Sequence, residues 1–263
     1  MYQAYWGLSQ SPFASATSRK LVHQHPLCGE ALARLDFLVE NRSRFGLLVG
    51  PSGSGKSLVL GEFTRRQRAA GAAVAFVGAA GLAPRDVLLE LTAEWGCNPC
   101  LSSDAGTLWR LATDRLAELR LEQVSAVLAL DDLDSAPSDV LTLVERLLQV
   151  PEVELTLAAA ARDEAVSHLG TGLLDRAELR IELALWTAED TRDYLQTSLQ
   201  AAGREQPAFA DRAVERLVQL SGGAPRRVGQ LAQLALIAGA GQNLTQIDEQ
   251  TVLAVHEELS AAR

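Results

Sequence analysis

The octapeptide "GPSGSGKS", residues Gly50–Ser57, decides the fold of this 263-residue chain. It matches the pattern Gly-x-x-x-x-Gly-Lys-Ser/Thr in full. It follows the short apolar stretch Phe45–Val49 and opens the helical pattern "KSLVLGEFTRRQRAAG", which stops at Gly71. A strand, a glycine-rich turn and a helix N-terminus together surround phosphate oxygens with backbone N–H groups. A glycine-rich turn that binds nothing is the weaker interpretation, because the motif and its context agree.

The lysine of this loop is one of only two in the chain, Lys20 and Lys56, among 24 basic residues. A compact ammonium on a flexible stem fits inside such a loop, where a planar guanidinium is too wide. In phosphate loops the lysine reaches the β- and γ-phosphates and the Ser/Thr hydroxyl binds Mg²⁺. The sequence therefore predicts ATP and Mg²⁺ as cofactors, with Ser57 on the metal. The predicted nucleotide-binding residues are Gly50, Pro51, Ser52, Gly53, Ser54, Gly55, Lys56, Ser57 and Leu58.

A second stretch, "LALDDLDS" at Leu128–Ser135, ends an apolar strand in three aspartates. We predict Asp131 as the Mg²⁺ partner, directly or through water. Asp132 stands where many P-loop ATPases place a glutamate that orients the attacking water. Asp134 is expected beyond the site, as a cap for the following helix. A solvated strand end is the alternative, which the upstream phosphate loop disfavours.

Short apolar runs alternate with helical patterns through the first two thirds of the chain. This alternation predicts a five-stranded parallel sheet sandwiched by helices, with strands at 45–49, 72–78, 124–130, 153–161 and 179–185. After residue 186 only helical patterns remain, with a cap predicted at Thr187 and a helix start at Pro225. We therefore divide the chain into an N-terminal segment and helix packing on the core (1–43), a P-loop ATPase core (44–186) and a small all-helical lid (187–263).

Composition narrows the function classes. The net charge of −9 argues against non-specific binding to nucleic acid. The longest apolar runs, Val124–Leu130 and Leu155–Ala161, are too short to cross a bilayer. The first residues lack the basic start and apolar run of a signal peptide, so a cytoplasmic location is expected.

The cysteines and histidines give weaker signals. Cys97 and Cys100 form a single Cys-x-x-Cys, and "HQHPLC" contains His23, His25 and Cys28. Structural zinc takes four ligands, so a loop or packing role is favoured for both stretches. Three cysteines imply no disulfide framework.

The phosphate loop (Walker A), the acid-tipped strand (Walker B) and the helical tail together resemble an AAA+ ATPase. The opening "YWGLSQSPF" and the lid stretch "SGGAPRRVGQLAQLAL" narrow the resemblance to ATPases of the ExeA/GspA type, from the general secretion pathway, and to related TniB-like transposition ATPases. The resemblance covers almost the whole chain.

The resemblance implies further roles. Arg226 matches the sensor-2 arginine, which reports on the γ-phosphate from the lid; a helix-capping surface arginine is the alternative. Arg176 matches an arginine that can act as a finger into the site of a neighbouring subunit, with Arg180 as its rival. A homo-oligomer is therefore expected.

Two departures from the family pattern concern hydrolysis more than binding. Asp132 is one methylene shorter than the usual glutamate. The strand-4 sensor of the family is usually a polar residue near the end of the strand. In this sequence only alanines or Arg162 are available for that position. The sequence also lacks the transmembrane helix and peptidoglycan-binding domain of membrane-bound relatives, so a direct role in secretion is not expected.

The leading hypothesis is an ATP-binding and ATP-hydrolysing switch or motor. It would act on an unknown protein partner through lid movement and oligomerisation. A DNA-associated ATPase is the alternative, favoured by "TRRQRAAG" and Arg226/Arg227 but not by the acidic charge. A slow-hydrolysing interaction module is a further alternative, because of Asp132. A small-molecule kinase is disfavoured by the helical tail.

Overall fold

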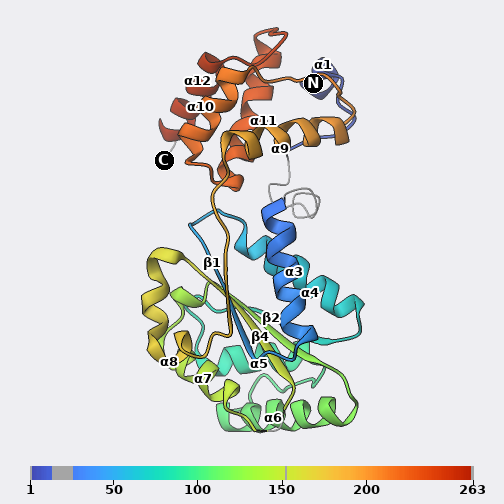
Figure 1. Ribbon diagram of the computed structural model, residues 1–263, viewed down its shortest axis with the longest axis vertical. Coiled ribbons are helices and arrows are strands. Elements are labelled where there is room, and N and C mark those ends of the chain that lie inside the picture. The colour runs from blue at the N-terminus through green and yellow to red at the C-terminus, as the bar shows by residue number, and fades with distance from the viewer. Residues whose placement is uncertain (1, 14–25, 152, 262–263) are drawn as a thin grey trace. The chain divides into compact units, whose positions relative to one another are not determined.

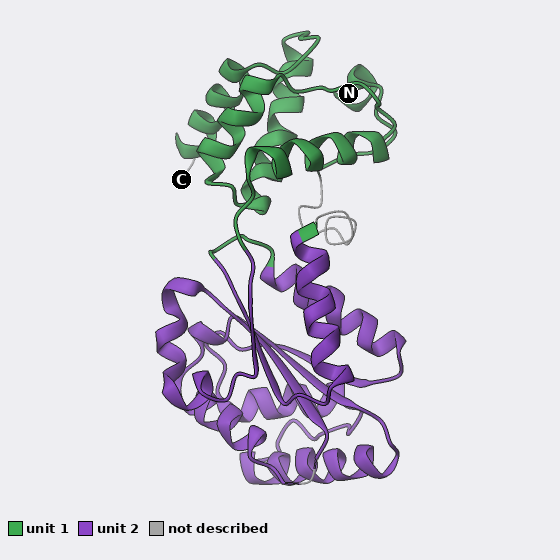
Figure 2. Cartoon of the chain, viewed as in Figure 1, with its two compact units in different colours: residues 1–26, 51–55, 184–263 green, residues 27–50, 56–183 purple. Residues whose placement is uncertain are grey.

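The computed structural model of the protein describes residues 2–13, 26–151 and 153–261, so His23 and His25 lie outside the described residues. The chain divides into two compact units (Figure 2). We call residues 27–50 and 56–183 the sheet unit, and residues 1–26, 51–55 and 184–263 the helical unit.

The sheet unit is built on five parallel strands in the order β2-β3-β4-β1-β5 (Figure 1), which confirms the predicted fold class. Every residue of β1, β3 and β4 is buried, as expected for central strands covered on both faces. The strands are β1 (Phe45–Val49), β2 (Ala73–Gly78), β3 (Ala126–Asp131), β4 (Leu155–Ala161) and β5 (Leu179–Glu182).

Helices cover the two faces of this sheet. Phe45, Leu47 and Val49 share one hydrophobic core with apolar residues of α5, α6 and α7. On the opposite face, Leu38 of α3 lies so close to Gly46 that a Cβ there would overlap with it. The helices are α3 (Pro26–Glu40), α4 (Lys56–Ala69), α5 (Pro84–Glu94), α6 (Ala105–Leu121), α7 (Ser138–Leu148) and α8 (Gly170–Leu174), with the 3₁₀ turns η1 (Leu133–Ser135) and η2 (Asp163–Leu169).

The helical unit contains α1 (Tyr2–Trp6), α9 (Ala188–Ala201), α10 (Asp211–Ser221), α11 (Pro225–Gly241) and α12 (Glu249–Ala261). Its helix ends follow the sequence signals. Thr187 caps α9 in a reciprocal capping box with Asp190, and α11 begins at Pro225. None of the described helices is both long enough and apolar enough to cross a bilayer.

The segment 1–43, predicted as one piece on the core, divides between the two units. Helix α3 packs against the sheet, whereas the described residues 2–13 pack in the helical unit. Trp6 is buried and its indole N–H donates to the Leu236 carbonyl at 2.8 Å. The Phe13 ring lies 5.7 Å from that of Tyr194. These large apolar side chains bury in the helical unit, which explains the division.

Candidate functional site

The loop between β1 and α4 has the backbone that its glycines predict. Gly53 and Gly55 have φ values of +81° and +105°, which residues with a Cβ rarely adopt. The Ser54 N–H donates to the Pro51 carbonyl at 3.2 Å and closes a turn. Helix α4 begins directly afterwards at Lys56, so its first N–H groups have no acceptor within the helix. Such a helix start favours an anionic ligand.

Lys56, the first residue of α4, has a fixed side chain. Its side chain is buried, and Nζ donates to the Gly50 carbonyl at 2.7 Å. Burial lowers the pKa of Lys56, while the charges of Asp134, Asp132 and Asp131 oppose that shift. The buried Ser54 hydroxyl has no hydrogen-bond partner within the described part of the chain. An unpaired buried polar atom is rare in native proteins, so a polar ligand such as a phosphate group fits this loop.

Asp131 and Ser57, far apart in sequence, meet beside the start of α4. Asp131 is the last residue of β3 and is buried. Burial raises the pKa of its carboxyl group, and a hydrogen bond with the Ser57 side chain opposes this rise. A hydroxyl beside a carboxylate is a ligand pair that suits Mg²⁺, which prefers oxygen atoms. The residues predicted to hold the metal are therefore neighbours.

Asp132 occupies a special backbone position. Its φ and ψ of 51° and 41° place it in the left-handed region, and its side chain is exposed. Aspartate tolerates this conformation better than most residues with a Cβ. Its N–H donates to Asp131 Oδ1 at 3.1 Å, so the backbone at Asp132 and the carboxylate of Asp131 are fixed together.

The prediction that Asp134 caps the following helix is wrong. Pro137 is the cap residue of α7, and no described side chain makes a capping hydrogen bond there. Asp134 is buried instead, and its carboxylate accepts hydrogen bonds from the backbone N–H and the Nε–H of Arg162, at 3.1 and 2.7 Å. From the sequence, Arg162 was considered only for the strand-4 sensor, and its pairing with Asp134 was not predicted. The one available signal was an arginine directly after a predicted strand.

The three predicted arginines lie on exposed positions. Arg226 is the second residue of α11 in the helical unit. Arg176 follows α8 in the sheet unit and makes no ion pair with any residue that the structure describes. Arg180 in β5 pairs with Glu182 at 3.3 Å. Of the two candidate finger arginines, Arg180 therefore has an ion-pair partner within its own strand.

Cys97 and Cys100 are free thiols on the loop after α5. Burial raises the pKa of Cys97, and a hydrogen bond with Ser102 lowers that of Cys100. No group of three or more metal-ligating side chains occurs among the described residues. The loop or packing role expected for this Cys-x-x-Cys stays a prediction.

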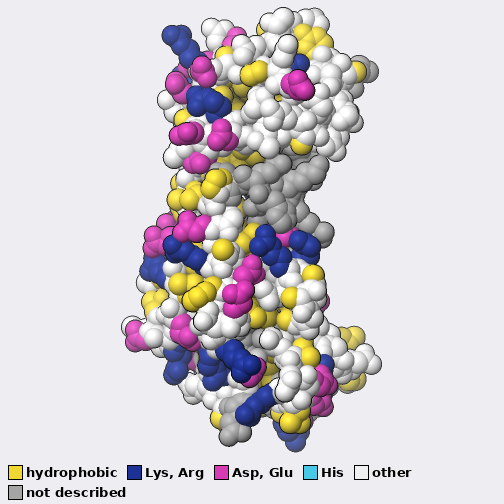
Figure 3. All heavy atoms as spheres, turned by 45° about the vertical axis from the view of Figure 1, so that its right-hand side comes forward, with side chains coloured by type: hydrophobic (Ala, Val, Ile, Leu, Met, Phe, Trp, Pro, Cys, Tyr) yellow, Lys and Arg dark blue, Asp and Glu magenta, His cyan; other side chains and the backbone are white. Residues whose placement is uncertain are grey.

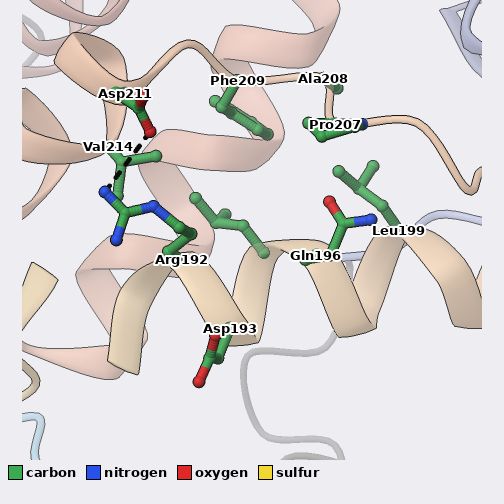
Figure 4. Close-up of a pocket in the computed structure, with 10 residues that line it drawn as sticks. Arg192, Asp193, Gln196, Leu199, Pro207, Ala208, Phe209, Asp211 and Val214 are labelled. Carbon is green, nitrogen blue, oxygen red and sulfur yellow. Dashed lines mark ion pairs between the residues drawn. The ribbon is translucent and has the colours of Figure 1, made fainter. Parts of the chain in front are cut away.

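A separate hollow of about 280 Å³ lies within the helical unit (Figure 4). Its wall is mostly apolar, with Leu199, Phe209 and Val214 among its residues. The Arg192 guanidinium, which lies beside it, pairs with Asp211 at 3.4 Å. The arginine is therefore already neutralised, so the hollow does not suit the phosphates of a nucleotide.

Comparison with known proteins agrees with this geometry. The AAA domain family matches residues 39–165, which include the phosphate loop and the acid-tipped strand. General secretion pathway protein A of Aeromonas hydrophila is 28% identical over 271 aligned positions. The alignment covers 100% of this chain and 48% of that protein, so the chain spans about half the length of its relative.

Solved structures share the fold. The ORC2 protein of Aeropyrum pernix, in ADPNP and ADP complexes, matches with a TM-score of 0.69 and 18% identity, over 89% of this chain and 68% of that one. The Thermotoga maritima RuvB Holliday junction branch migration motor matches with a TM-score of 0.58 and 17% identity, over 88% and 68%. At these identities the likeness concerns the fold alone. Residues 39–165 are thus similar to the AAA domain family, and the whole chain is similar to general secretion pathway protein A.

Proposed function

We propose that the protein binds ATP with Mg²⁺ at Gly50–Leu58 and hydrolyses it. The observation that carries this proposal is the buried Lys56 ammonium at the start of α4, whose Nζ donates to the Gly50 carbonyl at 2.7 Å. The N–H groups at the start of α4 and the Lys56 ammonium would hold the phosphates. Ser57 and Asp131 would hold Mg²⁺, which neutralises charge on the β- and γ-phosphates.

Asp132 is the proposed residue that orients the attacking water. It is the exposed acid next to the buried Asp131, and its backbone is left-handed. A general base or water-orienting carboxylate contributes about 10²- to 10⁴-fold to a rate. The short side chain of Asp132 limits its reach, so we propose slow turnover.

We expect Asp132→Asn to lower kcat by about 100-fold with little change in ATP affinity. Asparagine also tolerates the left-handed conformation, so the turn is preserved while the carboxylate charge is lost. Asp132→Glu restores the longer side chain and should raise turnover above that of the wild type. Steady-state ATPase assays and nucleotide titrations measure both variants. Equal kcat for Asp132→Asn and wild type would remove Asp132 from the mechanism.

The same assay tests assembly. We propose that ATP moves the helical unit and that a neighbouring subunit supplies Arg176, which would complete the site in an oligomer. Turnover per chain should then rise with protein concentration, and a rate independent of concentration argues for a self-sufficient monomer.

Arg226 would report on the γ-phosphate from the helical unit, by its match to the sensor-2 position. The target of the motor is a protein partner, because the contacts of α4 disfavour DNA.

The three α4 arginines among those that favoured a DNA-associated function form ion pairs with acidic side chains. Arg65 pairs with Glu62, Arg66 with Asp36, and Arg68 with Glu94. On the face shown in Figure 3, basic and acidic side chains are intermixed. Binding to a phosphate backbone depends on arginines and lysines that are free to release counterions. Paired guanidinium groups on an acidic protein do not supply them.

A further inference from the structure

The side chain of Asp134 is fully buried, and its shortest side-chain hydrogen bond comes from Arg162. Its carboxylate accepts from the backbone N–H of Arg162 at 3.1 Å and from Nε–H at 2.7 Å. Arg162 Nη2 also donates to the Ser135 hydroxyl at 3.2 Å. Three hydrogen bonds therefore tie the turn after β3 to the residue that follows β4.

The tied turn contains a strained residue. Asp132 lies in the left-handed region, which residues with a Cβ adopt less readily than glycine. Within the turn, the Ser135 N–H donates to the Asp132 carbonyl at 3.0 Å, and the Ala136 N–H to that of Leu133 at 3.1 Å. Strained backbone persists where its surroundings hold it in place. Asp134, two residues further on, supplies such a hold through its side chain.

The other end of the tie lies at the end of β4, next to β1 in the sheet. Arg162 directly follows Ala161, which is paired with Val49, the last residue of β1. Gly50 directly follows β1, and its carbonyl accepts from Lys56. The pair thus joins the turn that carries the metal-side acids to the strand beside the phosphate loop.

We propose that Asp134 and Arg162 form a positioning clamp, which holds the turn so that Asp131 and Asp132 keep their geometry for hydrolysis. This inference rests on the proposed ATPase function and adds two residues that act through others. Misplacing a reacting group by about 1 Å costs up to about 100-fold in rate. The clamp should therefore affect kcat far more than nucleotide binding.

Asp134→Ala tests the clamp without burying an unpaired charge, because the Arg162 side chain remains 39% exposed. We expect kcat to fall about tenfold or more, while KM for MgATP stays within about threefold. The double variant Asp134→Ala/Arg162→Ala should be no slower than Asp134→Ala, since both changes break one interaction. Asp134→Asn retains an acceptor for the Arg162 N–H and should recover part of the rate.

Arg42→Ala is the matched control, because it removes the exposed pair with Glu154 beside the opposite end of β4. Every rate is divided by the fraction of chains that bind an ATP analogue, so a loss of folded protein does not imitate a loss of kcat. If Asp134→Ala keeps the wild-type kcat per binding chain, or if the two changes are additive, the clamp is wrong. If the wild type binds MgATP without hydrolysing it, the proposed function fails first.

Discussion

Lys56→Ala is expected to lower kcat for ATP hydrolysis by at least about 100-fold, because it removes the cation from the centre of the phosphate loop. Lys56 is buried and already donates to the Gly50 carbonyl, so its ammonium is held in place before nucleotide arrives. Burial also lowers its pKa, although the charges of four aspartates, Asp134, Asp132, Asp131 and Asp163, favour the charged form. ATP affinity should fall as well, since the charge faces phosphate before and during the reaction.

The measurement is a steady-state ATPase assay combined with titration of a fluorescent ATP analogue. Arg34→Ala serves as the control, since Arg34 is exposed and pairs only across one helical turn with Glu30. Its removal changes the net charge by the same amount but touches no residue of the site. If Lys56→Ala binds and hydrolyses ATP as the wild type does, the assignment of the phosphate loop is wrong.

Asp131→Asn should produce opposite effects on activity and stability. Hydrolysis at millimolar Mg²⁺ should fall by about 100-fold or more, because the carboxylate of the metal pair is lost. The metal-free protein should become more stable, because burial raises the pKa of Asp131 and its ionised form therefore opposes folding. The stabilising contribution of a group with a raised pKa is present at low pH and is lost as the pH rises through the folded pKa. The gain in stability of Asp131→Asn over the wild type should therefore grow as the pH rises from the ordinary pKa of an aspartate to the raised pKa in the folded protein. Above that pH the gain should stay constant.

Thermal unfolding without metal across that pH range, and ATPase rate against Mg²⁺ concentration, measure the two effects. Asp139→Asn, an exposed change in the first turn of α7, is the control and should alter neither. An Asp131→Asn variant that keeps full Mg²⁺-dependent activity would place the metal elsewhere.

The fold followed from local patterns in the sequence. The three central strands β1, β3 and β4 are buried apolar runs, and all five strands lie within or close to their predicted ranges, although β5 is short and mostly exposed. The phosphate loop was predictable because its glycines and lysine are required by short-range geometry. The cap at Thr187 was predictable for the same reason, since its partner Asp190 lies within the same helical turn.

The contacts that the sequence did not predict are long-range. Asp134 and Arg162 stand 28 positions apart, and only the pairing of β3 with β4 brings them together. The left-handed backbone of Asp132 depends on the whole turn rather than on one residue. Residues 2–13 pack where Trp6 and Phe13 find partners, which no periodicity indicates. Side chains whose partners come from distant segments need the folded arrangement to be identified.

A crystal structure of the protein with Mg²⁺ and a non-hydrolysable ATP analogue tests the central claim most directly. The account predicts phosphate oxygens against the N–H groups at the start of α4, with the Lys56 ammonium turned from the Gly50 carbonyl to the β- and γ-phosphates. It also predicts Mg²⁺ between the Ser57 hydroxyl and Asp131. Nucleotide bound away from Gly50–Leu58, or a metal held without Ser57 and Asp131, would contradict it.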